Sequence, residues 1–182
     1  MGMNPSFVIS IMARDRVGII ADVTGAIREL GGNLADLSQT VLGGYFTMIL
    51  VGSFPDGVTA EGLRERLRHL DPADPFEVGV KPRLEAPTPA PAGLAKYVLT
   101  AVGPDKIGLV ATLSGYLRDQ AINIEDLATR VDGERYWMTL LVNLPAGTEV
   151  GAFKRHLKQA MAAAGILAEL QHESIFRATN EV

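Results

Sequence analysis

An internal repeat constrains the fold of this chain more than any other feature. The segment Asp15-Arg16-Val17-Gly18-Ile19-Ile20-Ala21 returns 90 residues later as Asp105-Lys106-Ile107-Gly108-Leu109-Val110-Ala111. At this offset ten positions between Asp15 and Gly44 are identical, and several of them are Asp, Gly or Asn, residues that favour turns. The 182 residues are therefore expected to form two domains of about 90 residues each, built on one plan.

The hydrophobic pattern of each repeat predicts the order strand, helix, strand, strand, helix, strand. Alternating apolar residues over 7–13 are typical of a strand, and apolar residues at helical spacing from Ile20 to Leu30 indicate a helix that Gly31-Gly32 ends. The remaining elements of the first repeat are expected at 33–41, 45–54, 59–70 and 76–84. Those of the second repeat are strands at 96–102, 123–132, 135–144 and 166–175 and helices at 107–121 and 148–164.

This order predicts an α+β protein of two ferredoxin-like βαββαβ domains, each with an antiparallel four-stranded sheet. The domains are expected at 1–84 and 95–182. Residues 85–94 lie between them and contain Pro87, Pro89 and Pro91, so they are expected to form an extended linker.

The third strand of each repeat predicts a surface that must be covered. Residues 45–54 and 136–142 are apolar on both faces of the strand, although both helices of such a domain lie on one face of the sheet. The helix-free face therefore needs a partner, either the other repeat or another chain, and a homodimer is expected.

Composition excludes several classes of protein. Seventeen Lys and Arg against 21 Asp and Glu give a net charge of -4 with no block of one sign, so direct nucleic acid binding is not expected. Cysteine is absent, and His69, His156 and His172 lack metal-ligand spacing, so no metal is expected. The chain has no nucleotide-binding or catalytic motif, which predicts a protein that is not an enzyme and needs no cofactor.

The sequence also gives no sign of a membrane or a secretory route. The longest apolar runs, such as 46–52, are too short to span a bilayer. Residues 1–12 lack the charged start and small-residue exit of a signal peptide. A soluble cytoplasmic protein is expected.

The repeated turn before the first helix of each unit is the main candidate ligand site. The first backbone N–H groups of a helix have no intrahelical acceptor and favour a carboxylate, and a glycine lets a small ligand approach the backbone closely. An alternative is that the two aspartates are helix N-caps and the glycines only relieve crowding. The candidate residues of these turns are Asp15, Arg16, Val17 and Gly18 in the first repeat and Asp105, Lys106, Ile107 and Gly108 in the second.

Asn33 and Asn123 follow the first helix of each repeat and are further candidates. Their amides could bond a zwitterionic ligand held across a domain interface. Alternatively, each asparagine simply tolerates the turn conformation after a helix.

These residues resemble those of tandem ACT domains. The resemblance rests on Asp15-Arg16-Val17-Gly18-Ile19, on Gly31-Gly32-Asn33-Leu34 followed by Asp36, and on their counterparts in the second repeat. Leu42-Gly43-Gly44-Tyr45-Phe46-Thr47-Met48, together with the proline-rich linker, resembles the glycine cleavage system transcriptional repressor group in particular. The family usually has proline before the glycine of the turn. This chain has Val17 and Ile107 there, so the two turns of this chain are expected to be less rigid.

The resemblance implies a non-enzymatic regulatory protein that binds a small amino acid, with glycine or serine foremost. Its ligand would meet the two turns, with Asn33 and Asn123 contributing across an interface. Its partner would be a LysR-type regulator of glycine or one-carbon metabolism. Two alternatives remain. One is a regulatory subunit or module of an amino-acid-metabolism enzyme similar to phosphoserine phosphatase or formyltetrahydrofolate deformylase, and the other is a dimerisation unit that binds no metabolite.

Overall fold

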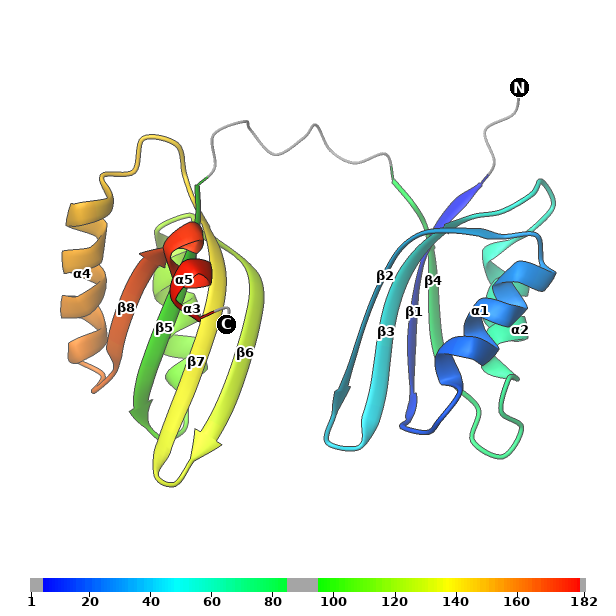
Figure 1. The fold of residues 1–182 in the computed structure, drawn as a ribbon, viewed down its shortest axis with the longest axis horizontal. Coiled ribbons are helices and arrows are strands. Elements are labelled where there is room, and N and C mark those ends of the chain that lie inside the picture. The colour runs from blue at the N-terminus through cyan, green and yellow to red at the C-terminus, as the bar shows by residue number, and fades with distance from the viewer. Residues whose placement is uncertain (1–4, 85–94, 181–182) are drawn as a thin grey trace. The chain divides into compact units, whose positions relative to one another are not determined.

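The computed structural model describes residues 5–84 and 95–180. The chain divides into two compact units, Met1–Pro87 (unit 1) and Thr88–Val182 (unit 2), each with its own sheet and helices (Figure 1). The predicted linker, 85–94, lies outside the described residues.

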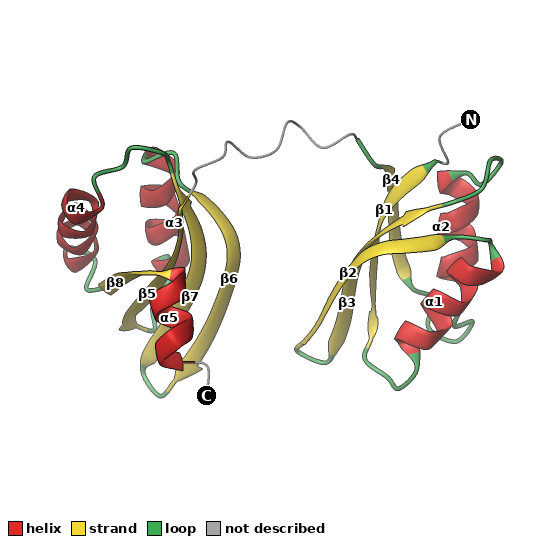
Figure 2. Ribbon diagram, turned by 45° about the horizontal axis from the view of Figure 1, so that its top comes forward, coloured by secondary structure: helices red, strands yellow, loops and turns green. Residues whose placement is uncertain are grey.

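Unit 1 has the predicted βαββαβ order. Its sheet is antiparallel throughout, in the order β2-β3-β1-β4, with β1 between β3 and β4. Helices α1 and α2 lie together on one face of this sheet (Figure 2). The elements are β1 (Ser6–Arg14), α1 (Ile19–Glu29), β2 (Asn33–Leu42), β3 (Tyr45–Ser53), α2 (Ala60–Arg68) and β4 (Glu77–Pro82).

Unit 2 repeats this arrangement in the sheet order β6-β7-β5-β8. The prediction of two ferredoxin-like domains with antiparallel four-stranded sheets is therefore confirmed. Its elements are β5 (Ala95–Pro104), α3 (Leu109–Asp119), β6 (Asn123–Asp132), β7 (Arg135–Leu144), α4 (Val150–Ala162), β8 (Leu167–His172) and α5 (Glu173–Asn180).

The core of each unit lies between the sheet and its two helices. In unit 1, Ile9 and Ile11 of β1 point into this layer, and they meet Val23 and Ile27 of α1 among other buried residues. The spacing of buried residues matches the expected periods, two along the strand and three to four along the helix. Only one face of each sheet is covered by these helices.

The other face of the unit 1 sheet, the open face, is exposed in this structure. Its residues alternate with the core residues, so that Met12 and Ile49 are exposed where Ile11 and Leu50 are buried. The sequence predicted that this face would need a cover, and within unit 1 no described element supplies one.

In unit 2 the chain supplies part of that cover itself. The last strand was predicted to run from 166 to 175, and this is wrong because β8 ends at His172 and α5 begins at Glu173. The backbone N–H of Ser174 donates to Nδ1 of His172 at 3.3 Å, at the point where the strand becomes a helix. Helix α5 packs against β5 and β8 on the side of the sheet opposite α3 and α4 (Figures 1 and 2).

Both units also contain a β-bulge that the sequence did not predict. The register of β2 against β3 shifts between Leu34 and Asp36, and that of β6 against β7 shifts between Ile124 and Asp126. The extra residue of unit 2, Glu125, accepts hydrogen bonds from Asn143 Nδ2 at 2.7 Å and from Lys96 Nζ at 2.6 Å. These donors, Asn143 first, lower the pKa of the Glu125 carboxyl.

Candidate functional site

The candidate turn of each unit is attached to the hairpin between the second and third strands. The backbone N–H of Asp15 donates to the carbonyl of Gly44 at 3.0 Å, and that of Asp105 donates to the carbonyl of Glu134 at 2.8 Å. The same bond at equivalent places shows that both turns have the same backbone frame. The side chains of Val17 and Ile107 in these turns are fully exposed.

Glycine, not aspartate, occupies the N-cap position of the helix that comes after each turn. Gly18 has φ 96° and ψ -6°, and Gly108 has φ 94° and ψ 0°, and neither helix has a side-chain hydrogen bond at its cap. The alternative that Asp15 and Asp105 are N-caps is therefore wrong. The first N–H groups of α1 and α3 remain available as donors, because only the N–H groups from the second turn onward find a carbonyl acceptor within the helix.

A hollow lies beside each turn. In unit 1 it has a volume of about 490 Å³, and Asp15, Arg16 and Gly18 line it together with Gln39 of β2 and Phe46 of β3. In unit 2 it has about 330 Å³, and Lys106 and Gly108 line it together with Tyr136 of β7. The two strand residues Gln39 and Tyr136 were not among the predicted site residues. The hairpin bond to Gly44 or Glu134 brings their strands to the turn, and no local sequence signal reports that contact.

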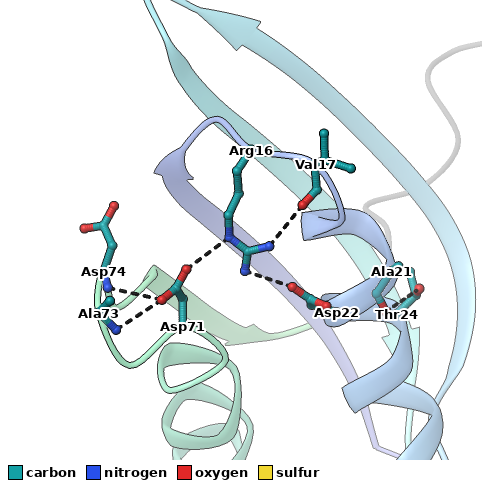
Figure 3. Close-up of polar contacts among 8 residues, drawn as sticks. All are labelled: Arg16, Val17, Ala21, Asp22, Thr24, Asp71, Ala73 and Asp74. Atoms are coloured by element: carbon teal, nitrogen blue, oxygen red, sulfur yellow. Dashed lines mark hydrogen bonds and ion pairs between the residues drawn. The ribbon is translucent and has the colours of Figure 1, made fainter.

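Arg16 joins the unit 1 turn to the loop between α2 and β4 (Figure 3). Its Nε donates to Asp71 Oδ2 at 3.0 Å, and its Nη2 donates to Asp22 Oδ2 at 2.8 Å. A third bond joins Nη1 to the carbonyl of Val17 at 3.2 Å. The guanidinium carbon also lies 5.7 Å from the ring centroid of Phe76, within the range of a cation–π contact.

The carboxylates around Arg16 hold it in the charged form. The hydrogen bond from Arg16 to Asp22 is the main cause that raises the pKa of the guanidinium. The pKa of Asp71 is lowered first by the backbone N–H of Ala73, which donates to its Oδ1 at 3.1 Å, and further by Asp74 N–H and by Arg16. Two carboxylates thus compensate the charge of Arg16 within unit 1.

The equivalent turn of unit 2 lacks this network. Lys106 stands where unit 1 has Arg16, and Thr112 stands where it has Asp22. Across the part of the chain that the structure describes, Lys106 has no ion-pair partner. The two turns therefore share a backbone geometry but differ in the charge that they offer to a ligand.

Asn33 and Asn123 lie at the opposite end of the helix from the turn. They open β2 and β6, directly after the end of α1 and α3. Each of these helices has 11 residues and hence is about 16 Å long. Asn123 borders a shallow hollow of about 460 Å³ with Ser114 and Arg118. Within one unit the structure therefore does not bring the asparagine and the turn together.

Two further features bear on the class of protein. Within residues 5–84 and 95–180, no group of three or more His, Asp or Glu side chains is placed to hold a metal ion. None of the described helices is long and apolar enough to cross a membrane.

The fold and the repeated turn define a protein of two ferredoxin-like units in tandem. The ACT domain family matches residues 7–68 and, through a second ACT group, residues 96–171. The chain belongs to the ACT domain family, and it contains two of these domains in tandem.

Curated relatives agree with this assignment. A UPF0237 protein of Methanopyrus kandleri is 33% identical over 90 residues, which cover 49% of this chain and 100% of that protein. A UPF0237 protein of Streptococcus pneumoniae is 52% identical over 46 residues, which cover 25% of this chain and 52% of that protein. The chain thus spans the whole of the first relative and about half of the second.

Two solved structures have the same fold over both units. A protein of unknown function from Galdieria sulphuraria matches with a TM-score of 0.71 at 23% identity, over 93% of this chain and 98% of that one. A protein provisionally assigned as a glycine cleavage system transcriptional repressor matches with a TM-score of 0.66 at 16% identity, with the same coverage.

Proposed function

We propose that this chain is a non-enzymatic sensor of a small amino acid, glycine or serine, that passes its ligand-bound state to a partner protein. The observation that carries the proposal is the repeated turn. In both units a glycine with positive φ opens a helix whose first N–H groups have no side-chain cap, beside a hollow. Such N–H groups favour a carboxylate, and the hollow leaves room for a small ligand.

In this proposal the ligand meets the turn of an ACT unit and an asparagine that contributes across an interface. Its carboxylate or ammonium binds at Asp15 to Gly18 or at Asp105 to Gly108. Asn33 or Asn123 completes the site across an interface, because neither lies near the turn of its own unit.

Of the two turns, that of unit 2 is the better carboxylate site. Arg16 already has two carboxylate partners, so a ligand carboxylate would have to compete with Asp22 and Asp71. Lys106 has an ammonium with no such competitor among the described residues. Unit 1 would then have mainly a structural or partner-binding role.

The proposed partner is a LysR-type DNA-binding regulator of glycine or one-carbon metabolism, contacted by the chain as a homodimer. The likeness to the protein provisionally assigned as a glycine cleavage repressor supports this choice. The net charge of -4 supports a role through protein contact rather than through direct binding to DNA. Copurification with an enzyme of amino acid metabolism would favour the alternative of a regulatory subunit.

Calorimetric titration of the full chain with glycine, serine and the other amino acids tests the proposal. Glycine has five non-hydrogen atoms, so its binding free energy cannot exceed about -7.5 kcal/mol, a dissociation constant of a few micromolar. We expect a dissociation constant between about ten micromolar and a few millimolar. Absence of heat for every amino acid at millimolar concentration would contradict the proposal.

Variants of the turn glycines locate the site. Gly108→Ala is expected to weaken binding at least tenfold, because a Cβ enters the space that the ligand approaches, and Gly18→Ala should have a smaller effect. Both residues have φ near 95°, so alanine also strains the backbone there. Gly57→Ala and Gly147→Ala are matched controls, since these glycines have φ 94° and 83° and also have open space around an added Cβ. Equal losses in all four variants would mean that strain, not ligand contact, explains the effect.

A further inference from the structure

The open face of unit 1 carries a group of adjacent exposed apolar side chains. Ile49 is 52% exposed, Tyr45 is 49% exposed and Met12 is 38% exposed. They lie on the neighbouring strands β1 and β3, where Ile49 pairs with Ser10 and Thr47 pairs with Met12. Scattered apolar residues are normal on a surface, but a contiguous patch at the centre of a sheet marks a binding surface.

The equivalent face of unit 2 provides an internal comparison. There α5 packs against β5 and β8, and Val98, the counterpart of Val8, is only 7% exposed. The counterpart of Ile49 is the polar Thr139, although Trp137 and Leu167 on the same face are 40% and 69% exposed. Within residues 5–84 no element equivalent to α5 comes after β4, and the open face of unit 1 keeps its apolar residues.

The centre of the open face has small side chains on either side of Ile49. Ser38, Ile49, Ser10 and Gly79 form one row across the four strands. A Cβ added to Gly79 would lie 2.6 Å from the Ser10 hydroxyl, so a larger residue there would displace that side chain. With small residues around Ile49, a second sheet can approach to the usual packing distance of about 10 Å.

Charges stand at the edges of this face and not at its centre. Lys81 on β4 and Asp36 on β2 share one row, because they pair with Val8 and Val51, which pair with each other. Glu77, also on β4, lies four residues from Lys81 and pairs with Met12. Lys81 has no ion-pair partner among the residues that the structure describes.

These charges are complementary to those of an identical face under two-fold symmetry. If the axis runs parallel to the strands through the centre of the face, β4 of one copy lies over β2 of the other, and Lys81 meets Asp36. If the axis runs across the strands, Lys81 meets Glu77 of the other copy. In both cases the remaining carboxylate lies opposite Thr40, so no like charges meet.

We infer that a second copy of this chain binds the open face of unit 1, sheet against sheet, and that unit 2 does not form the same contact because α5 packs on β5 and β8 at its equivalent face. The inference rests on the homodimer of the proposed function and identifies its surface. Exposed Ile49 and Tyr45 supply the apolar centre, and Lys81 supplies the ionic contacts at the edge.

Sedimentation equilibrium of the full chain and two matched variants tests the inference. Ile49→Glu places two carboxylates near the symmetry axis and is expected to weaken the dimer at least 100-fold. Thr139→Glu makes the same change at the equivalent exposed position of unit 2 and is expected to leave the dimer intact. Glycine titration of the Ile49→Glu variant measures ligand binding separately from dimer formation, so a failure of this inference can be told from a failure of the proposed function. A monomeric parent, or a dimer that only Thr139→Glu dissociates, would overturn the inference.

Charge exchange provides a second test that does not depend on Ile49. Lys81→Glu is expected to weaken the dimer about tenfold or more, because it brings two carboxylates together. Combination with Asp36→Lys restores the dimer if the axis runs parallel to the strands, and combination with Glu77→Lys restores it if the axis runs across them. If Lys81→Glu has no effect, or if neither second change restores the dimer, the sheet-against-sheet contact is wrong.

Discussion

At the scale of single residues, Arg16 and Lys106 occupy the same place in the repeat but do different things. Arg16 connects the turn of unit 1 to Asp71, which lies 55 residues away and comes after α2. Because Lys106 has no described partner, the unit 2 turn is joined to the rest of its unit by the backbone bond of Asp105 and not by such a network. Arg16 thus holds the turn of unit 1 in place through its ion pairs, whereas the charge of Lys106 in unit 2 remains available to a ligand.

The acid stability of unit 1 should depend on Asp71. Its pKa is lowered below the ordinary value of 3.8 in the folded chain, so it stabilises the fold above that value, and this contribution is lost as the pH falls through the lower folded pKa. We expect Asp71→Asn to lower Tm by a few degrees at pH 7 and to flatten its decline below about pH 4. Thermal unfolding between pH 2 and pH 7 measures both.

Asp119→Asn is the control for this prediction. Among the described residues, Asp119 pairs only with its neighbour Arg118, so it joins no distant parts of unit 2 there. Its substitution should change neither Tm at neutral pH nor its slope in acid, since exposed pairs contribute little. If Asp71→Asn behaves like this control, the Arg16 network does not stabilise the turn.

The sequence predicted which residues form the turns but not their surroundings. The glycines, aspartates and asparagines stood out because turn residues recur at a fixed offset, and this signal is local. Asp71 and Phe76 could not be assigned to Arg16 from sequence, because that contact depends on how α2 and β4 pack. The N-cap alternative for Asp15 and Asp105 failed for a backbone reason, since the chain enters each helix through a left-handed glycine.

At the scale of elements, the two units differ most after the last strand of each sheet. The apolar and polar residues of 166–175 continue far enough to suggest a longer strand, and this hid the start of α5 at Glu173. The β-bulges were equally hidden, since one extra residue leaves the alternation on either side intact. Strands and helices with a strong hydrophobic period were predictable. The residue at which a strand ends and a helix begins on the same sheet was not, because it depends on tertiary packing.

Removal of α5 should uncover the face of unit 2. A chain that ends after His172 would expose Val98, which is buried on that face, together with the surface that α5 contacts on β5 and β8. We expect the free energy of unfolding to fall by about 1–3 kcal/mol, in line with exposure of one or two apolar side chains. Chemical denaturation monitored at Trp137, which lies on β7 of the same unit, measures the change.

The same truncation should also change self-association. If α5 is the cover that keeps the unit 2 face out of the dimer, the truncated chain should form species larger than a dimer. Addition of Ile49→Glu to the truncated chain should then remove the unit 1 contact but leave the new one. If truncation changes neither the free energy of unfolding nor the association state, α5 does not act as a cover for this face of unit 2.

At the scale of the whole molecule, several basic residues of the helices are paired with carboxylates. Arg64 and Arg66, which look like a basic stripe in the sequence, are paired with Glu61 and Glu29. In unit 2, Lys158 is paired with Glu169 at 2.7 Å. These pairs reduce the positive charge that the helices could offer to a DNA backbone, and the chain as a whole carries a net charge of -4.

This charge distribution predicts that the chain alone does not bind DNA. Binding to DNA gains most of its free energy from release of counterions by clustered Lys and Arg, and paired arginines surrounded by carboxylates cannot supply that gain. We expect the purified chain to leave the fluorescence anisotropy of labelled duplex DNA unchanged at about 50 mM salt, with or without glycine. A regulator of the proposed type should bind DNA under the same conditions, and addition of this chain should alter its affinity in a glycine-dependent way. Binding of the chain alone that weakens steeply with salt would contradict the prediction, because it would require a basic surface that the paired side chains do not provide.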